Sequence, residues 1–385
     1  MITAWPVAAK TVLTDAFASA GAVAKITVHG LVFGKAASRT AAKATRAILP
    51  QPILLRIADA LVAQHLNPFI DQALPRPSGA MVGARPGTQV LDISHGMTLA
   101  IERCLDSWSH GGVAQSDVEA FFDNVNLLRV AMFAEHELGL DPAWAATAVR
   151  VQLMPQVTLA VGPLEPFALP ARSRGTLTGS KVAGAMSRIP VEHTLVTLHP
   201  SWAASGFRVG QHVLTAGSFV DNLFFLGRTS VAALRMAQEA EQMLATTWGL
   251  RIKPESRALL LPRGGIPPAD PGSFPVVYQC PVLGHIVEGS GSTQAGWDNT
   301  RKAAWRAFFA NCAGKRARAA GRSAQIKLLS RAVRPTLEFR FSRWPYFEKR
   351  AKINCPSAAK HGLHLHRHTA PPWRRDGRVL PATPP

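Results

Sequence analysis

The residues most suited to catalytic chemistry are two aspartates, in a chain that has only 24 acidic residues among 385. Asp117 lies in SDVEAFFDNV (116–125) and Asp221 lies in SFVDN (218–222), and apolar residues flank both. A carboxylate at the end of an apolar strand is costly to bury unless a cation partners it. Two such carboxylates on adjacent strands can hold two Mg²⁺ ions about 4 Å apart, which stabilises the oxygens of a phosphoryl transfer. The alternative is that each aspartate only caps a helix or closes a turn.

Hydrophobic periodicity predicts the elements that must position these aspartates. A strand followed by a turn is expected over 113–125. Strands over 205–216 and 219–227 are expected to join through a short turn at 216–218, which places Asp221 near the start of the second strand. The Pro- and Gly-rich residues 73–88 are expected to form a loop. Further helices are predicted over 48–72, 90–106, 126–138, 142–152, 182–197 and 230–248, and further strands over 250–262 and 281–288.

Both acidic segments resemble motifs of one known family. SDVEAFFDNV is similar to motif A of the reverse transcriptases of group II introns and non-LTR retrotransposons. SFVDNLFFLG (218–227) is similar to motif C of that family, which is an aromatic residue, any residue and then two aspartates. The remaining similar segments follow in the order of the family: LNPFID (66–71) and GARPGTQVLD (83–92) of the fingers, RGTLTGSKVAG (174–184) of motif B, GLRIKPESR (249–257) of motif D and VLGHIVEGSGS (282–292) of motif E.

The resemblance implies an α+β fold of the right-hand polymerase type, with fingers, a palm made of an antiparallel sheet backed by helices, and a helical thumb. The fingers would cover 48–112, the palm 113–292 and the thumb 293–350. Residues 1–47 are expected to be a poorly ordered N-terminal extension, and residues 351–385 a disordered basic tail. The implied activity is that of an RNA-directed DNA polymerase, which transfers nucleotides to a primer 3′-hydroxyl. Its partners would be an RNA template, a DNA or RNA primer and deoxynucleoside triphosphates.

The resemblance also implies roles for single residues. Asp117 and Asp221 would be ligands of two Mg²⁺ (or Mn²⁺) ions, with the carbonyl of Val118 beside them. Phe122 stands where the family has an aromatic steric gate, a ring that would clash with a ribose 2′-hydroxyl; the alternative is plain core packing. Gly179 would let the backbone approach the template or the incoming base; the alternative is a simple turn.

Several positions depart from the family pattern. The second aspartate of motif C is Asn222, which can ligate Mg²⁺ through its carbonyl but adds no charge, and this weakens the expected catalytic site. Thr178 replaces the glutamine of motif B, and Ala183–Gly184 replace its Ser-Pro. Ser256 stands at the lysine of motif D, so no proton donor to pyrophosphate is assigned. Arg85 would touch the incoming triphosphate or the template; the alternative is a solvated loop charge.

Positive charge is concentrated at the C-terminal end. The net charge is +19, and residues 301–385 hold 20 Lys and Arg against 3 Asp and Glu. Such an excess is typical of a surface that neutralises nucleic-acid phosphates. Trp305, Phe308 and Phe309 lie at i, i+3 and i+4 and are expected to face the core of the thumb. The cations expected to contact the nucleic-acid backbone are Lys302, Arg306, Lys315, Arg316, Arg318 and Arg322.

Composition excludes some classes of protein. Hydrophobic residues make up 47% and charged residues 17% of the chain, which rules out a disordered polyelectrolyte as its main body. No uncharged apolar run reaches the roughly 20 residues of a membrane helix, so no membrane partner is expected. The four scattered cysteines include no CxxC pair, which favours a reducing intracellular compartment, with the nucleus preferred to an organelle.

Two alternatives stay open. The first is a catalytically impaired, reverse-transcriptase-like nucleic-acid-binding protein from a degenerate retroelement, and Asn222 favours it. The second is a basic organellar or membrane-surface protein unrelated to polymerases, for which the Ala-, Ser- and Thr-rich residues 1–47 would be a transit peptide. The second alternative predicts that Asp117 and Asp221 lie far apart, whereas the polymerase hypothesis predicts that they converge.

Overall fold

The chain divides into two units, Met1–Ala303 and Ala304–Pro385, and its described residues combine helices with sheets. The computed structural model describes residues 26–34, 45–77, 80–83, 85, 87–107, 110–160, 165–209 and 211–341. Its mixture of helices and mostly antiparallel strands is the α+β class expected from the sequence.

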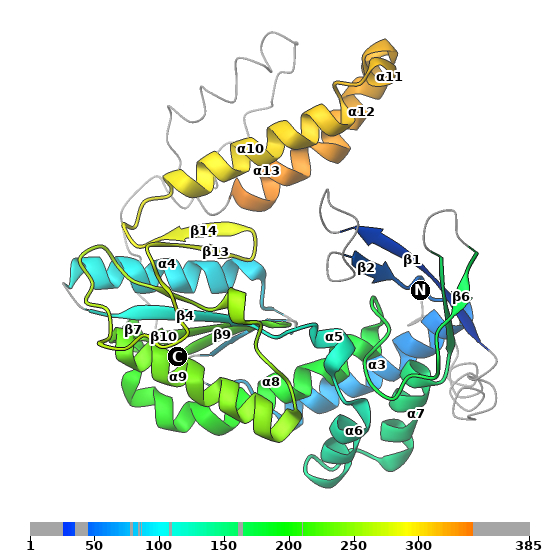
Figure 1. Ribbon diagram of the computed structural model, residues 1–385, viewed down its shortest axis with the longest axis horizontal. Coiled ribbons are helices and arrows are strands. Elements are labelled where there is room, and N and C mark those ends of the chain that lie inside the picture. Colours follow the sequence, from blue (N-terminus) through cyan, green and yellow to red (C-terminus); the bar gives the residue numbers. More distant parts are fainter. Residues whose placement is uncertain are drawn as a thin grey trace, which may run out of the picture. The chain divides into compact units, whose positions relative to one another are not determined.

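The centre of the first unit is a six-stranded sheet with the strand order β12-β11-β4-β10-β9-β3 (Figure 1). Its two central strands, β4 (Gly112–Asp117) and β10 (Asn222–Gly227), pair antiparallel, with Asn222 opposite Asp117. The register of this pair decides which residues leave the two strands at the same edge of the sheet. The outer strands are β9 (Ala216–Phe219), β3 (Ala80–Val82), β11 (Ala258–Leu260) and β12 (Val276–Val277).

Both faces of this sheet are buried. Along β10, Leu223 and Phe225 belong to one hydrophobic cluster, whereas Phe224 and Leu226 belong to another. Successive side chains of a strand point to opposite faces, so burial on both faces requires the uninterrupted apolar run seen in this strand. Figure 1 shows α8 (Lys181–Trp202) and α9 (Ser230–Met243) on one face, and α4 (Val90–Asp106) with the hairpin of β13 (Gln279–Val282) and β14 (His285–Glu288) on the other.

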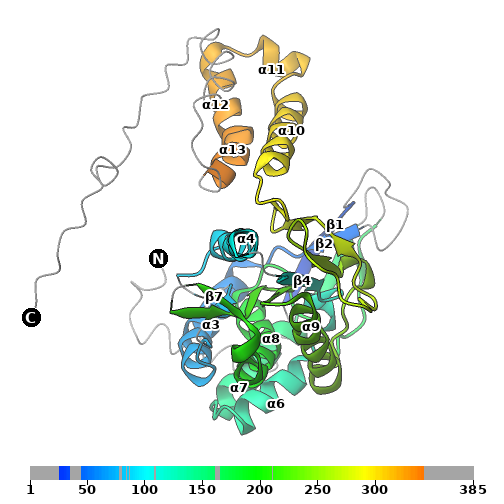
Figure 2. The same ribbon diagram turned by 90° about the vertical axis from the view of Figure 1, so that its left-hand side faces the viewer.

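A second group of elements surrounds α8. The helices α3 (Ile53–Ala73), α6 (Leu127–His136) and α7 (Pro142–Leu153) pack against it (Figure 2). A four-stranded sheet contains β2 (Thr45–Ile48), β1 (Thr27–Gly34), β5 (Gln156–Ala160) and β6 (Phe167–Ala168), in that order. The short elements of the unit are α5 (Phe121–Asn124), η3 (Ala203–Ser205), β7 (Phe207–Val209), β8 (His212–Leu214), η4 (Leu244–Trp248) and η5 (Pro254–Ser256).

Helix α8 begins at a buried carboxylate of α3. The backbone amide of Lys181 donates to Asp59 Oδ2 at 2.6 Å and that of Val182 donates to Asp59 Oδ1 at 3.2 Å, while the Ser180 hydroxyl also donates to Oδ1. Burial raises the pKa of Asp59 above its ordinary value, and these hydrogen bonds offset only part of the rise. Since the first amides of a helix have no partner within the helix, Asp59 both satisfies them and places α8 relative to α3.

The second unit is helical in its described part, residues 304–341. Helix α10 (Gln294–Asn311) starts in the first unit and ends in the second, and α12 contacts both α11 and α13. The six cations expected to contact a nucleic-acid backbone, from Lys302 to Arg322, are all exposed. The remaining helices are α11 (Lys315–Ala319), α12 (Arg322–Ala332) and α13 (Arg334–Phe341).

The prediction that Trp305, Phe308 and Phe309 face a core is wrong for Trp305 and Phe309, and Phe308 is half-buried. Trp305 is 51% exposed and Phe309 is 64% exposed, and the three rings contact one another at centroid separations of 5.5 to 5.8 Å. An apolar stripe becomes a core only if a facing layer supplies further apolar side chains. Helices α11 and α12 contain no buried residue, so they provide no such layer.

The helices predicted over 48–72, 90–106, 182–197 and 230–248 are confirmed. The last of these ends in a π-helical turn, η4, followed by Gly249 in the left-handed conformation. The strand predicted over 250–262 is wrong in length, because only Ala258–Leu260 pair with β4.

Three other predictions are wrong. Residues 216–218 form part of strand β9 instead of a turn, and the turn lies at Val220–Asp221. The loop expected over 73–88 contains β3, which pairs with β9. Part of the extension 1–47, expected to be poorly ordered, forms β1 and β2, because β1 finds a partner in β5 more than a hundred residues later. Residues 351–385 lie outside the described residues.

Four charged side chains, three of them buried and Asp71 half-buried, form an ionic cluster between α3, the segment after β3, and α8. Arg85 donates to both carboxylate oxygens of Glu192 and to the carbonyl of Leu74. Arg188 lies 3.1 Å from Glu192 Oε1 and 2.5 Å from Asp71 Oδ1. Glu192 is thus the anion shared by two guanidinium groups, and removing one member of such a cluster leaves an uncompensated buried charge.

We expect Glu192→Gln to lower the free energy of unfolding by about 3 to 5 kcal/mol, since the two buried guanidinium groups then lose their shared anion. Urea unfolding measures this loss. The control is Glu255→Gln, whose partner Lys253 is exposed, and it should stay within about 0.5 kcal/mol of the parent chain. Equal losses in the two variants would show that the cluster does not hold α8.

Candidate functional site

The sheet brings the two predicted aspartates together. Asp117 is the last residue of β4, and Asn222, the first residue of β10, lies directly opposite. Asp221 precedes Asn222 in the two-residue turn from β9, and its carbonyl accepts a hydrogen bond of 2.9 Å from the Val118 amide. The side chains of Asp117 and Asp221 are themselves close enough to hydrogen-bond. This contradicts the hypothesis of an unrelated basic protein, which placed the two aspartates far apart.

The proximity of the two carboxyl groups changes the acidity of Asp117. The pKa of Asp117 is raised to about 6, first by burial and then by the negative charge of Asp221. A hydrogen bond between the two side chains raises this pKa further, and the positive charge of Lys253 lowers it. Two carboxylates that repel each other at one edge of a sheet are a site that a proton or a cation stabilises.

The backbone on the far side of Asp117 is held by the segment that resembles motif D. The amide of Asp117 donates to Ser256 Oγ at 2.9 Å, and the carbonyl of Asp117 accepts from the Lys253 amide at 2.9 Å. The Ser256 hydroxyl donates to the carbonyl of Lys253 at 2.6 Å. Ser256 therefore positions the end of β4, and Lys253 is the cation that acts on the carboxyl pair.

The polar atoms of the pair fit a divalent cation. Asp117 Oδ1 is buried and has no hydrogen-bond partner among the described residues, which is costly for a carboxylate. Asn222 Nδ2 donates to Asp221 Oδ1 at 3.0 Å. Carboxylate and amide oxygens are the ligands that Mg²⁺ takes. No group of three or more His, Cys, Asp or Glu suited to a metal occurs in the described part of the chain, so a cation here would have two carboxylates and the Asn222 amide.

Strained backbone flanks both aspartates. Ala120, Val220 and Leu283 are the non-glycine residues with positive φ in the described ranges. Val220, with φ of 59°, immediately precedes Asp221, and Ala120, with φ of 43°, follows Asp117 by three residues. A β-branched residue in the left-handed region is a true outlier, and strain of this kind persists where the surrounding structure enforces it, as at functional sites.

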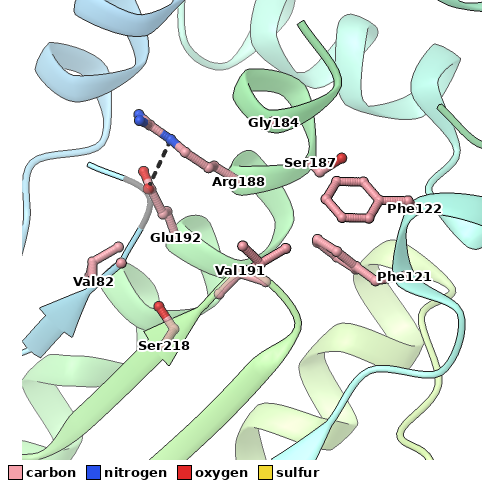
Figure 3. A pocket seen from close by; sticks show the side chains of 11 residues that line it. Val82, Phe121, Phe122, Gly184, Ser187, Arg188, Val191, Glu192 and Ser218 are labelled. Atoms are coloured by element: carbon pink, nitrogen blue, oxygen red, sulfur yellow. Dashed lines mark ion pairs between the residues drawn. The ribbon is translucent and has the colours of Figure 1, made fainter. Parts of the chain in front are cut away.

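Phe122 lies beside a cavity instead of inside the core. It is half-buried, whereas its neighbour Phe121 is 3% exposed and belongs to the main hydrophobic cluster. Figure 3 shows both rings beside α8, where they line a cavity of about 40 Å³. Phe121 is thus a core residue, whereas Phe122 is a half-buried residue that lines the cavity.

Gly179 has an open backbone, whereas the guanidinium of Arg85 is engaged inside the fold. Gly179 has φ of +92°, which requires glycine, and no described atom lies within 4 Å of an added Cβ, so its backbone is open to a ligand. Arg85 is 8% exposed and its guanidinium is bound by Glu192. The prediction that Arg85 touches a triphosphate or a template is contradicted by this geometry, because its donors are occupied inside the fold.

Comparison with known proteins finds similar solved structures, but no matching family model and no matching curated protein. Among solved structures, the chain is similar to telomerase from Candida albicans in complex with the TWJ fragment of telomeric RNA, with a TM-score of 0.46 and 9% identity, covering 93% of this chain and 61% of that chain. It is also similar to apo telomerase from Candida tropicalis truncated from its C-terminal domain, with a TM-score of 0.42 and 9% identity, covering 63% of this chain and 51% of that chain.

The chain therefore spans between about half and three fifths of the length of these two structures. Both TM-scores lie below 0.5, so the functional assignment rests on the geometry of the chain itself. As for membranes, none of the helices in the described ranges has the length and apolarity needed to cross a bilayer.

Asp117→Asn should remove a pH dependence of stability. Because the folded-state pKa of Asp117 is raised from 3.8 to about 6, its contribution to stability is complete below pH 4 and is lost as the pH rises through 6. At pH 8, without divalent cations, we expect the free energy of unfolding of Asp117→Asn to exceed that of the parent chain by on the order of 1 kcal/mol, after allowance for solvent screening.

Urea unfolding at pH 4, 6 and 8 measures this difference, which should vanish at pH 4. Glu165→Gln, at an exposed position, is the control and should show no such change with pH. If the parent chain and Asp117→Asn respond identically to pH, the two carboxylates do not interact as described.

Proposed function

We propose that this chain is a polymerase of the reverse-transcriptase type, an RNA-directed DNA polymerase that transfers deoxynucleotides to a primer 3′-hydroxyl. The observation that carries the proposal is the convergence of Asp117 and Asp221 at the edge of the β4–β10 pair. The resemblance of these two segments to motifs A and C predicts this pairing, and the strand register produces it independently of the resemblance.

Each residue of the site would have a separate role. Asp117 and Asp221 would hold a divalent cation, and Asn222 would add an uncharged oxygen. A bound Mg²⁺ would supply positive charge that favours the ionised primer hydroxyl and the negative charge developing on the phosphates. The open backbone at Gly179 would lie against the template or the incoming base, and Phe122 would contact the sugar of the nucleotide. The carbonyl of Val118 would lie beside the cation.

The number of ions follows from the charge of the site. Two carboxylates carry two negative charges, which balance one Mg²⁺, whereas two ions would bring four positive charges. Asn222 cannot supply the missing charge. We therefore propose that a second Mg²⁺ enters with the triphosphate of the nucleotide, whose own charge compensates it.

The second unit would bind the nucleic-acid backbone. Its described residues 304–341 contain nine Lys and Arg and one acid, Glu338. Exposed cations bind phosphates without regard to base sequence, which a polymerase requires of the region that holds its template and primer.

A second candidate function is nucleic-acid binding without catalysis. Asn222 favours it, because the site lacks the carboxylate that the resembled family has at this position. The same fold and the same basic unit would then serve binding alone.

Primer extension on an RNA template with Mg²⁺ or Mn²⁺ separates the two candidates. We expect extension by the parent chain, a loss of about 10³-fold in Asp117→Ala, and a gain of about 10-fold in Asn222→Asp, since a second charge strengthens cation binding. Glu165→Ala, at an exposed position, should leave the rate unchanged. A chain that binds RNA but extends no primer, even as Asn222→Asp, would be the binding protein.

RNA binding by the basic helices should depend steeply on salt. Each phosphate contact that is lost reduces the slope of log K against log salt by about 0.7 to 0.9. The double variant Lys315→Ala/Arg316→Ala should therefore lower the slope by about 1.5, measured by fluorescence anisotropy with an unstructured RNA. Arg56→Ala/Arg129→Ala removes two exposed cations of the first unit and should leave the slope unchanged. Equal slopes for both double variants would place the RNA elsewhere.

A further inference from the structure

The cavity beside Phe122 is small and mostly apolar. Its volume of about 40 Å³ holds a hydroxyl group or about three water molecules, and is too small for a nucleobase. Its apolar walls are valines and phenylalanines from four different segments, which suit the C–H faces of a sugar. The residues that line it include Phe122, Phe121, Val191, Val220, Gly184 and Ser187.

Two small residues of α8 create this space. Gly184 and Ser187 are three residues apart, so they lie on the same side of the helix, beside the Phe122 ring (Figure 3). A Cβ added at Gly184 would meet no described atom within 4 Å, so the helix is hollowed here. Glycine inside a helix is disfavoured relative to alanine, and no positive φ requires it at this position.

The hydroxyl of Ser187 is a buried group without a described partner. Ser187 is 1% exposed, and its Oγ makes no hydrogen bond to any described residue. Serine and threonine inside a helix commonly donate to the carbonyl four residues earlier, as Thr194 of the same helix donates to Pro190 at 2.8 Å. An unsatisfied buried hydroxyl is destabilising, and a ligand hydroxyl in the cavity would satisfy it.

The polar neighbours of Ser187 are already engaged. Glu192 accepts from Arg85, and Arg188 pairs with Asp71. The charged residues of the lining are thus paired, which leaves the hydroxyl groups of Ser187 and Ser218 for a ligand, and of these two Ser187 Oγ is the buried atom without a described partner. The recognised group is accordingly neutral, since no unpaired charge of the described lining faces it.

Two residues that line the cavity are close along the chain to the carboxyl pair. Val220, which lines it, directly precedes Asp221, and Phe122 follows Asp117 by five residues. A nucleotide whose phosphates lie at Asp117 and Asp221 has its sugar only a few bonds away. The sugar is therefore the part of the nucleotide that reaches the cavity.

We propose that this cavity admits the 2′-hydroxyl of a ribonucleoside triphosphate, and that Ser187 is the specificity-determining residue that hydrogen-bonds to it. The inference rests on the proposed polymerase site and extends it. A Phe122 ring without an adjacent cavity would select deoxynucleotides, whereas this chain would accept ribonucleotides as well. The space next to the ring takes up the hydroxyl that would otherwise clash with it.

The test is the binding of ATP and dATP to the full chain with a primer and an RNA template whose next base is uracil, in Mg²⁺, measured by competition against a fluorescent dATP. We expect the parent chain to bind the two nucleotides within about tenfold of each other. Ser187→Ala should shift the ratio about fivefold towards dATP, since one buried hydrogen bond is lost. Gly184→Val, which fills the cavity, should shift the ratio in the same direction.

Ser201→Ala is the matched control, because Ser201 is an exposed serine of the same helix and its loss should leave the ratio unchanged. A Ser187→Ala chain that keeps the parent ratio, or a parent chain that rejects ATP more than a hundredfold, overturns the inference and leaves the polymerase proposal intact. Absence of binding by either nucleotide overturns both. Thermal unfolding confirms that Ser187→Ala is folded, and we expect its melting temperature to equal or exceed that of the parent chain, because a buried unsatisfied hydroxyl is gone.

Discussion

The repulsion between the Asp117 and Asp221 carboxyl groups is the constraint on which the site depends. The antiparallel register of β4 and β10 imposes it by placing Asn222 opposite Asp117. Both faces of β10 are buried, so a slip of one residue would exchange Leu223 and Phe225 with Phe224 and Leu226 between two cores. Packing on two faces thus maintains a local arrangement that is unfavourable until a proton or a cation arrives.

The same packing accounts for the strain around the pair. The turn between β9 and β10 has only two residues, and Val220 occupies a left-handed conformation there because the strands on either side are fixed by their registers. The effect is that Asp221 stands at the edge of the sheet instead of continuing the strand. Functional sites are where such local costs are retained.

Helix α8 links the carboxyl pair to the cavity. Asp59 fixes where the helix starts, and the ionic cluster around Glu192 holds the middle of the helix against the segment that contains Arg85. A helix held at two points can keep a hollow at Gly184 and Ser187 without collapsing into it. The hollow, the Phe122 ring and the carboxyl pair are therefore parts of one arrangement, in which stability is provided by buried charges placed away from the chemistry.

Much of the site was visible in the sequence, because an acid within an apolar run has few possible partners. The apolar periodicity predicted the main helices, and the resemblance of SDVEAFFDNV and SFVDN to motifs A and C predicted that the two aspartates converge. Local pattern could not predict which cations are solvated: Arg85 looks like a loop charge until Glu192, more than a hundred residues away, is brought beside it. Nor could it show that Trp305 and Phe309 are exposed, because the sequence pattern of an aromatic stripe is the same whether or not another layer of structure covers it.

The sequence by itself determined which residues could ionise, where the main helices lie, and where the positive charge accumulates, because these depend on residues close together along the chain. Only the tertiary structure decided that β1 and β2 belong to a sheet, that the turn lies at Val220–Asp221, and that Ser187 is buried without a partner. These features depend on contacts between segments far apart in the chain, and such contacts exist only once the chain has folded.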